Sequence, residues 1–180
     1  MCDYAFPEML TGQEIKRIRK QLQFTQQQFA DFLRVSKKTI ERWEAGEKEI
    51  TGPIVALVKI LTEQPQLPEM LQIPPRKYPL RLFYMFQNEI CTVIDVDEMN
   101  RQVKIYNYTN LFIYRAFGRD EMPSFERYEE FLSERCFPES SDKMKLILQD
   151  LDLPFYDPLL IIEKTQGRMA EDDFWIRIER

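Results

Sequence analysis

Residues 25–46 read TQQQFADFLRVSKKTIERWEAG, and this stretch decides the fold of the N-terminal part of the chain. Thr25 and Ser36 are both favourable N-cap residues, and each precedes apolar residues at helical spacing. Gln28 stands three residues after Thr25 and completes a capping box. Gly46 follows the second apolar pattern, where a left-handed helix end is expected. The stretch therefore predicts two short helices joined by a tight turn.

The outward face of the second predicted helix is basic and polar. Ile40 and Trp43 are expected on its buried face. The outward residues are Lys37, Lys38, Thr39, Glu41 and Arg42. Three of these five are cationic and lie where side chains of a helix in the major groove reach base edges, and arginine and lysine can donate to guanine O6 and N7. The alternative is an ordinary helix pair with a solvated charged face, but the capping residues, the small Ala30 and the terminal glycine favour the DNA-binding arrangement.

These residues resemble the Cro/C1-type (XRE) helix-turn-helix family over roughly residues 11–62. WEAGEKEITGPIVALVKIL at 43–61 also resembles antitoxin-type members of that family. The resemblance implies that Gln26 contacts a phosphate of double-stranded operator DNA and that basic residues of the second helix read bases. The predicted DNA-binding residues are Gln26, Ser36, Lys37, Lys38, Thr39 and Arg42. Arg34 departs from the family, whose turn usually carries a glycine because the backbone adopts a positive φ.

Charge is divided unevenly along the 180 residues, whose net charge is −5. Residues 1–75 hold ten basic and ten acidic side chains, so the acidic excess lies in the remainder. Within residues 13–42, eight basic side chains stand against three acidic ones. A local basic face can bind phosphate while the rest of the protein repels it. The acidic remainder is therefore better suited to contacting protein than DNA.

The composition argues against several classes of protein. Histidine is absent, which removes Ser-His and Cys-His nucleophiles and histidine metal sites. Cys2, Cys91 and Cys136 lie far apart, which argues against a zinc site or a disulfide framework and favours a reducing cytoplasm. No apolar run approaches the roughly 20 residues of a membrane span, and the N-terminus does not read as a signal peptide. We expect a cytoplasmic protein that is not an enzyme and needs neither cofactor nor metal.

The sequence predicts a helix-turn-helix domain over residues 1–63, with helices that also begin after Thr11 and near Pro53. Five prolines between residues 64 and 79 predict a linker without regular helix. Residues 80–180 form the second predicted domain. The fold class is α+β: an all-α N-terminal domain followed by a small α+β domain with an antiparallel sheet.

Strand and helix patterns alternate in the second predicted domain. Aromatic and β-branched residues predict a hairpin over 80–86 and 90–96, and alternation predicts further strands over 101–106 and 173–178. Helices are expected after Ser124, Ser141 and Asp157, with Pro138 stopping the first of them.

This order resembles the small N-terminal domain of HipA-type kinases, which also exists as the separate protein HipS in three-gene HipBST systems. The resemblance is carried by RLFYMFQNEICTVIDVD (81–97), YEEFLSERCFPESSDKMKLIL (128–148) and YDPLLIIEKTQGRMAEDDFWIRI (156–178). The large catalytic lobe of such kinases cannot fit in this length. The resemblance therefore implies an antitoxin joined to an accessory kinase domain.

Two functions are compatible with these patterns. The first is a homodimeric regulator that acts as the antitoxin of a type II toxin–antitoxin system, represses its own operon and binds a HipA/HipT-like kinase toxin. Two-fold symmetry would place its half-sites about one helical turn apart. The second is a ligand-sensing XRE-family repressor whose C-terminal aromatics line a small-molecule pocket instead of a sheet core or a protein interface. Those aromatics are Tyr84, Tyr106, Tyr108, Tyr114 and Trp175.

Overall fold

The computed structural model describes residues 4–46, 48–137, 139 and 144–180. The chain divides into two compact units, Met1–Gln72 (unit 1) and Ile73–Arg180 (unit 2). The division falls inside the stretch predicted to be a linker, while the predicted domain limits themselves stay predictions. Among the described residues, no helix combines the length and apolarity that crossing a bilayer requires.

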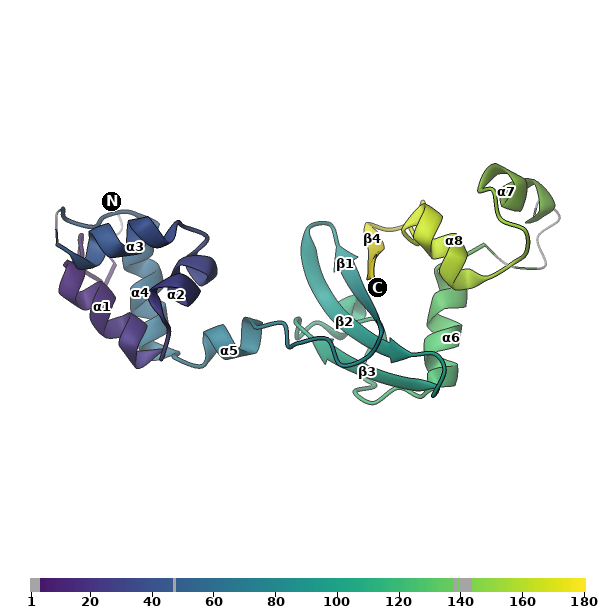
Figure 1. Cartoon of the computed structure of the whole chain (residues 1–180), viewed down its shortest axis with the longest axis horizontal. Coiled ribbons are helices and arrows are strands. Elements are labelled where there is room, and N and C mark those ends of the chain that lie inside the picture. Colours follow the sequence, from purple (N-terminus) through teal and green to yellow (C-terminus); the bar gives the residue numbers. More distant parts are fainter. Residues whose placement is uncertain (1–3, 47, 138, 140–143) are drawn as a thin grey trace. The chain divides into compact units, whose positions relative to one another are not determined.

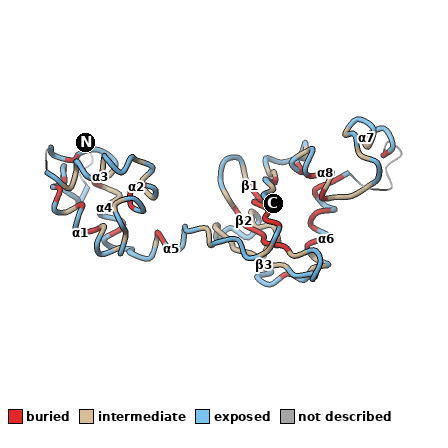
Figure 2. The backbone as a smooth tube through the Cα atoms, viewed as in Figure 1, coloured by how far each residue is buried: buried red, intermediate tan, exposed pale blue. Residues whose placement is uncertain are grey.

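Unit 1 is all-α, as predicted (Figure 1). Its helices are α1 (Gly12–Gln21), α2 (Gln26–Leu33), α3 (Lys37–Glu44), α4 (Pro53–Glu63) and α5 (Leu67–Leu71). Each of the first four contributes buried residues to one apolar core (Figure 2). Its most deeply buried side chains are Ile15, Phe29, Ala30, Ile40 and Leu61. This core fixes α2 and α3 against α1 and α4.

The first helix begins where only a glycine fits. Thr11 caps α1 through a capping box with Glu14, as the sequence predicted. A Cβ atom at Gly12 would lie 2.1 Å from the backbone oxygen of Trp43, far inside van der Waals contact. The close approach of α1 to α3 therefore requires glycine at the first position of α1.

The prediction that residues 64–79 lack regular helix was wrong for one turn. Helix α5 occupies Leu67–Leu71 with Pro68 in its first turn. Proline is tolerated there because its missing N–H has no partner within the helix in any case. Pro68 is also buried, and Leu67 packs against the core of unit 1.

Unit 2 is built on a four-stranded antiparallel sheet in the order β3-β2-β1-β4 (Figure 1). The strands are β1 (Leu80–Phe86), β2 (Glu89–Asp97), β3 (Gln102–Asn107) and β4 (Phe174–Glu179). The predicted hairpin, third strand and terminal strand are confirmed. The register shifts once, since Tyr84 faces Thr92 and Met85 faces Ile90, which leaves Cys91 as a bulge.

Helices cover one face of this sheet. They are α6 (Phe125–Glu134) and α8 (Pro158–Thr165). Helix α7 (Met144–Asp150) lies beyond them and reaches the same core through Leu148, and a 3-10 turn η1 (Phe112–Tyr114) precedes all three. Ser124 caps α6 and Asp157 caps α8, as predicted, whereas Pro138 and Ser141 lie outside the described residues. The largest core of the unit lies between sheet and helices. The α+β fold class is thus confirmed.

The five aromatics singled out in the sequence pack against the two faces of the sheet. Tyr84 is buried in the large core and stacks on Phe174, with ring centroids 4.9 Å apart, and Tyr114 packs against the same core. The other three, Tyr106, Tyr108 and Trp175, pack against a small cluster on the opposite face. This packing is what a sheet core predicts for these aromatics, and the ligand-sensing alternative stays a prediction.

A buried ion pair joins β1 and β2 on that opposite face. Arg81 donates to both carboxylate oxygens of Asp95 at 2.5 and 2.8 Å, and Asp95 is fully buried. The same guanidinium donates to the Pro74 oxygen at 2.9 Å, while the Lys77 amide donates to Asp95 at 2.8 Å. The pair therefore holds residues 74–77 against the sheet.

Removal of one partner of this pair should strongly destabilise unit 2. Arg81→Ala leaves the buried Asp95 carboxylate without its cation, and we expect a loss of about 3–5 kcal/mol. Amide hydrogen exchange of β1 and β2 as a function of urea measures it. Arg127→Ala, which removes an exposed pair with Glu130, is the control and should cost about 1 kcal/mol or less. Equal effects of the two variants would contradict a structural role for the buried pair.

Candidate nucleic-acid interface

Helices α2 and α3 begin at the caps that the sequence predicted. The Thr25 hydroxyl accepts from the Gln28 amide at 3.2 Å, and the Gln28 side chain accepts from the Thr25 amide at 2.9 Å. The Ser36 hydroxyl accepts from the Thr39 amide at 3.1 Å. Each cap satisfies backbone N–H groups that have no partner within the helix, so both helix starts are fixed by local chemistry.

The turn between the helices keeps the left-handed geometry although it carries no glycine. Arg34 ends α2 with φ 57° and ψ 38°, and Gly46, after α3, has φ 74°. The Arg34 amide still donates to the Asp31 oxygen, and the Val35 amide donates to the Ala30 oxygen at 3.0 Å. A non-glycine residue in this conformation costs about 1–2 kcal/mol. The substitution therefore leaves the turn intact at a cost in stability.

The packed faces of the two helices set which side of α3 is outward. Ala30 and Ile40 are completely buried, so the helices cross closely. Trp43 was expected to be buried but is only half-buried at the edge of the same core. On the opposite side Lys37, Lys38, Glu41 and Arg42 are exposed, as predicted.

The outward residues differ in how freely their side chains can reach a ligand. Lys37 forms an ion pair with Glu41 at 3.3 Å, and both side chains are about half exposed. Lys38 and Arg42 form no ion pair with any residue in the described ranges. The Ser36 and Thr39 hydroxyls lie 2.8 Å apart and share a hydrogen bond, with Thr39 half-buried. Lys38 and Arg42 are thus the most available cationic donors on α3.

Gln26 is held in place by a residue of α3. Its amide nitrogen donates to Glu44 Oε2 at 2.9 Å, and the side chain is half-buried. The hydrogen bond fixes the side chain at the first position of α2, where backbone N–H groups also point outward. The predicted phosphate contact of Gln26 stays a prediction, now with a defined geometry.

The sequence interpretation missed the ion pair beneath this face. Arg19 was expected on the solvated basic side of α1, but it donates to Glu44 at 2.6 and 3.0 Å and to the Phe24 oxygen at 2.8 Å. The side chains of Arg19 and Glu44 are 12% and 7% exposed. A signal for this was present, because Arg19 follows Ile15 by four residues and so lies on the buried side of α1.

The surroundings of Glu44 keep its carboxylate charged. Burial favours the neutral form, but hydrogen bonds from Arg19 and Gln26 favour the anion and prevail, so the pKa of Glu44 lies below its ordinary value. The hydrogen bond that Arg19 donates to Glu44 likewise raises the pKa of Arg19, against the opposing effect of burial. A charged, fully bonded carboxylate therefore connects the three helices.

Comparison with known proteins agrees with this arrangement. Residues 15–58 match a family model described as helix-turn-helix. Neither the curated proteins nor the solved structures contain a match. The match covers α1 through the first part of α4, about a quarter of the chain, and identifies a helix-turn-helix domain of the class through which regulators bind DNA.

The charge of Glu44 gives unit 1 a specific acid dependence. Its folded-state pKa is depressed, so its contribution to stability is full above the unfolded value of about 4.3 and is lost as pH falls through the folded-state pKa. We expect Glu44→Gln to flatten the fall in the melting temperature of unit 1 in this acid range. Glu41→Gln, which alters an exposed pair on the same helix, is the control. A parent-like acid profile for Glu44→Gln would show that the carboxylate contributes nothing.

Proposed function

We propose that this protein is a sequence-specific transcriptional regulator that acts by binding DNA rather than by catalysis, with α3 as its recognition helix. The observation that carries the proposal is the exposed, unpaired state of Lys38 and Arg42 on the helix that follows the turn, within the described residues. Both can donate to guanine in the major groove. The hydroxyls of Ser36 and Thr39 lie at the start of the same helix.

Phosphate contacts from the N-terminal end of α2 and from α1 would fix the position of the protein along the duplex. Glu44 accepts one N–H of the Gln26 side-chain amide, which leaves the second N–H and the backbone N–H at the start of α2 as donors for a phosphate oxygen. The exposed Lys16, Arg17 and Lys20 add positive charge on α1. Phosphate contacts of this kind supply affinity that depends on salt, not sequence. A homodimer would place two recognition helices on half-sites about one helical turn apart.

The finer proposal is that the protein is an antitoxin that represses its own operon and holds a HipA/HipT-like kinase toxin through unit 2. The resemblance of residues 80–180 to the HipA N-terminal domain and their excess of acidic side chains support it. Co-purification of the chain with a kinase encoded beside it tests this part. A neighbouring gene product that is unrelated to kinases, or does not bind, would remove the toxin partner and leave the DNA-binding proposal untouched.

Substitutions of base-reading and of phosphate-contacting residues should affect DNA affinity differently. The operator for this comparison is obtained by selection from random duplexes. Lys38→Ala and Arg42→Ala should each lose about 1–3 kcal/mol on the selected site and little on random DNA. Gln26→Ala should weaken binding similarly on both. Fluorescence anisotropy at fixed salt measures these affinities, with Lys59→Ala on α4 as a control that changes neither. If all four variants bind the selected site as tightly as the parent, the proposed docking is wrong.

A further inference from the structure

The outer edge of β4 is the side of this strand that no other strand of unit 2 pairs with. Strand β4 pairs with β1 along one side only and ends the sheet. At its N-terminal end this edge is occupied. The Phe174 amide donates to the Asp172 carboxylate, and the Phe174 oxygen accepts from Arg135. The Ile176 amide donates to the Gln166 oxygen at 2.7 Å.

The C-terminal half of the same edge is open. In an antiparallel sheet both backbone groups of a residue point to the same side, and alternate residues share that side. The Ile176 amide points away from β1, so the groups of Ile178 and Arg180 point away from it too. Within the described residues, the Ile176 oxygen and both backbone groups of Ile178 have no hydrogen-bond partner. Unpaired groups of this kind are a template for another strand.

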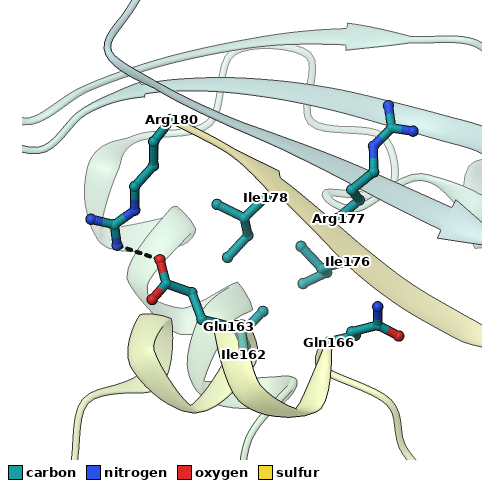
Figure 3. A pocket seen from close by; sticks show the side chains of 7 residues that line it. All are labelled: Ile162, Glu163, Gln166, Ile176, Arg177, Ile178 and Arg180. Atoms are coloured by element: carbon teal, nitrogen blue, oxygen red, sulfur yellow. Dashed lines mark hydrogen bonds and ion pairs between the residues drawn. The ribbon is translucent and has the colours of Figure 1, made fainter.

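A groove of about 410 Å³ runs beside these unpaired groups, between β4 and α8 (Figure 3). Ile162, Ile176 and Ile178 line it, and Figure 3 shows their side chains facing the groove. Ile162 and Ile176 belong to the buried core, so only Ile178 exposes apolar surface there. Glu163 and Arg180 form an ion pair across one end. The groove therefore leaves room beside the unpaired backbone groups, where an added strand would pair through main-chain hydrogen bonds.

We propose that a second copy of this chain occupies the edge, with β4 of each copy paired antiparallel to β4 of the other. The inference rests on the homodimeric form of the proposed regulator and assigns the surface through which the two copies pair. With Ile178 opposite its own symmetry mate, the two copies exchange two hydrogen bonds at Ile178, and each Arg180 amide donates to the Ile176 oxygen of the other. The two sheets become one continuous sheet.

Charge selects this register over the others that two-fold symmetry allows. Centring the pair on Ile178 places Arg177 of each copy directly opposite Glu179 of the other, so two cross-strand ion pairs form. Centring it on Arg177 or Glu179 would place like charges opposite each other. Centring it on Ile176 is blocked, because the Gln166 oxygen already takes that amide. The edge is thus self-complementary in one register.

Charge reversal at this edge tests the proposal in the full chain. Arg177→Glu alone and Glu179→Arg alone each oppose like charges twice per dimer, so each should raise the dimer dissociation constant about tenfold or more. An equimolar mixture of the two variants restores both ion pairs and should associate as tightly as the parent. Sedimentation equilibrium at micromolar concentration measures all three samples.

Lys104→Glu is the matched control, because Lys104 of β3 lies over the Tyr106 ring much as Arg177 of β4 lies over the Phe83 ring of β1. It should leave the dissociation constant unchanged. A monomeric parent, a dimer that neither single variant weakens, or a mixture that does not reassociate would overturn the assigned surface. DNA selection by unit 1 is measured separately, so a failure here and a failure of the regulator proposal are distinguishable.

Discussion

The carboxylate of Glu44 is the point on which the arrangement of unit 1 depends. It lies at the end of α3 and accepts hydrogen bonds from Arg19 of α1 and Gln26 of α2. Three helices are therefore joined by one charged group that is 7% exposed. Apolar packing alone would allow α3 to rotate or slide, whereas directional bonds to both neighbours fix its orientation. The outward face of α3 is thereby held in one position.

Unit 2 uses the same device for a different purpose. Arg81 and Asp95 hold residues 74–77 on the sheet, and Arg135 holds the chain before β4 through Asp172 and the Gly167 oxygen. The arginines are nearly buried and each satisfies several acceptors at once. Removing water from such pairs is costly, so they stabilise a structure only when every group is bonded, as these are.

Local chemistry explains how much of the fold could be predicted from the sequence. The caps at Thr11, Thr25 and Ser36 and the alternation of β4 depend on neighbouring residues, and all were predicted. The ion pairs could not be predicted in the same way, because Arg19 and Glu44 are 25 residues apart and Arg135 and Asp172 are 37 apart. Only the fold brings such partners together. Four of the five outward residues of α3 were predicted correctly as exposed, whereas Thr39 is half-buried. Their contacts with DNA still rest on the resemblance and on the geometry of α3.

The proposed regulator reads DNA only if the outer face of α3 meets the bases. Nuclear magnetic resonance of the isotope-labelled full chain, titrated with a duplex selected from random sequences, tests it directly. We expect the largest shifts, and direct contacts to base protons, at residues 36–42, with weaker shifts at the start of α2. Shifts confined to unit 2, or equal shifts with selected and scrambled duplexes, would contradict it.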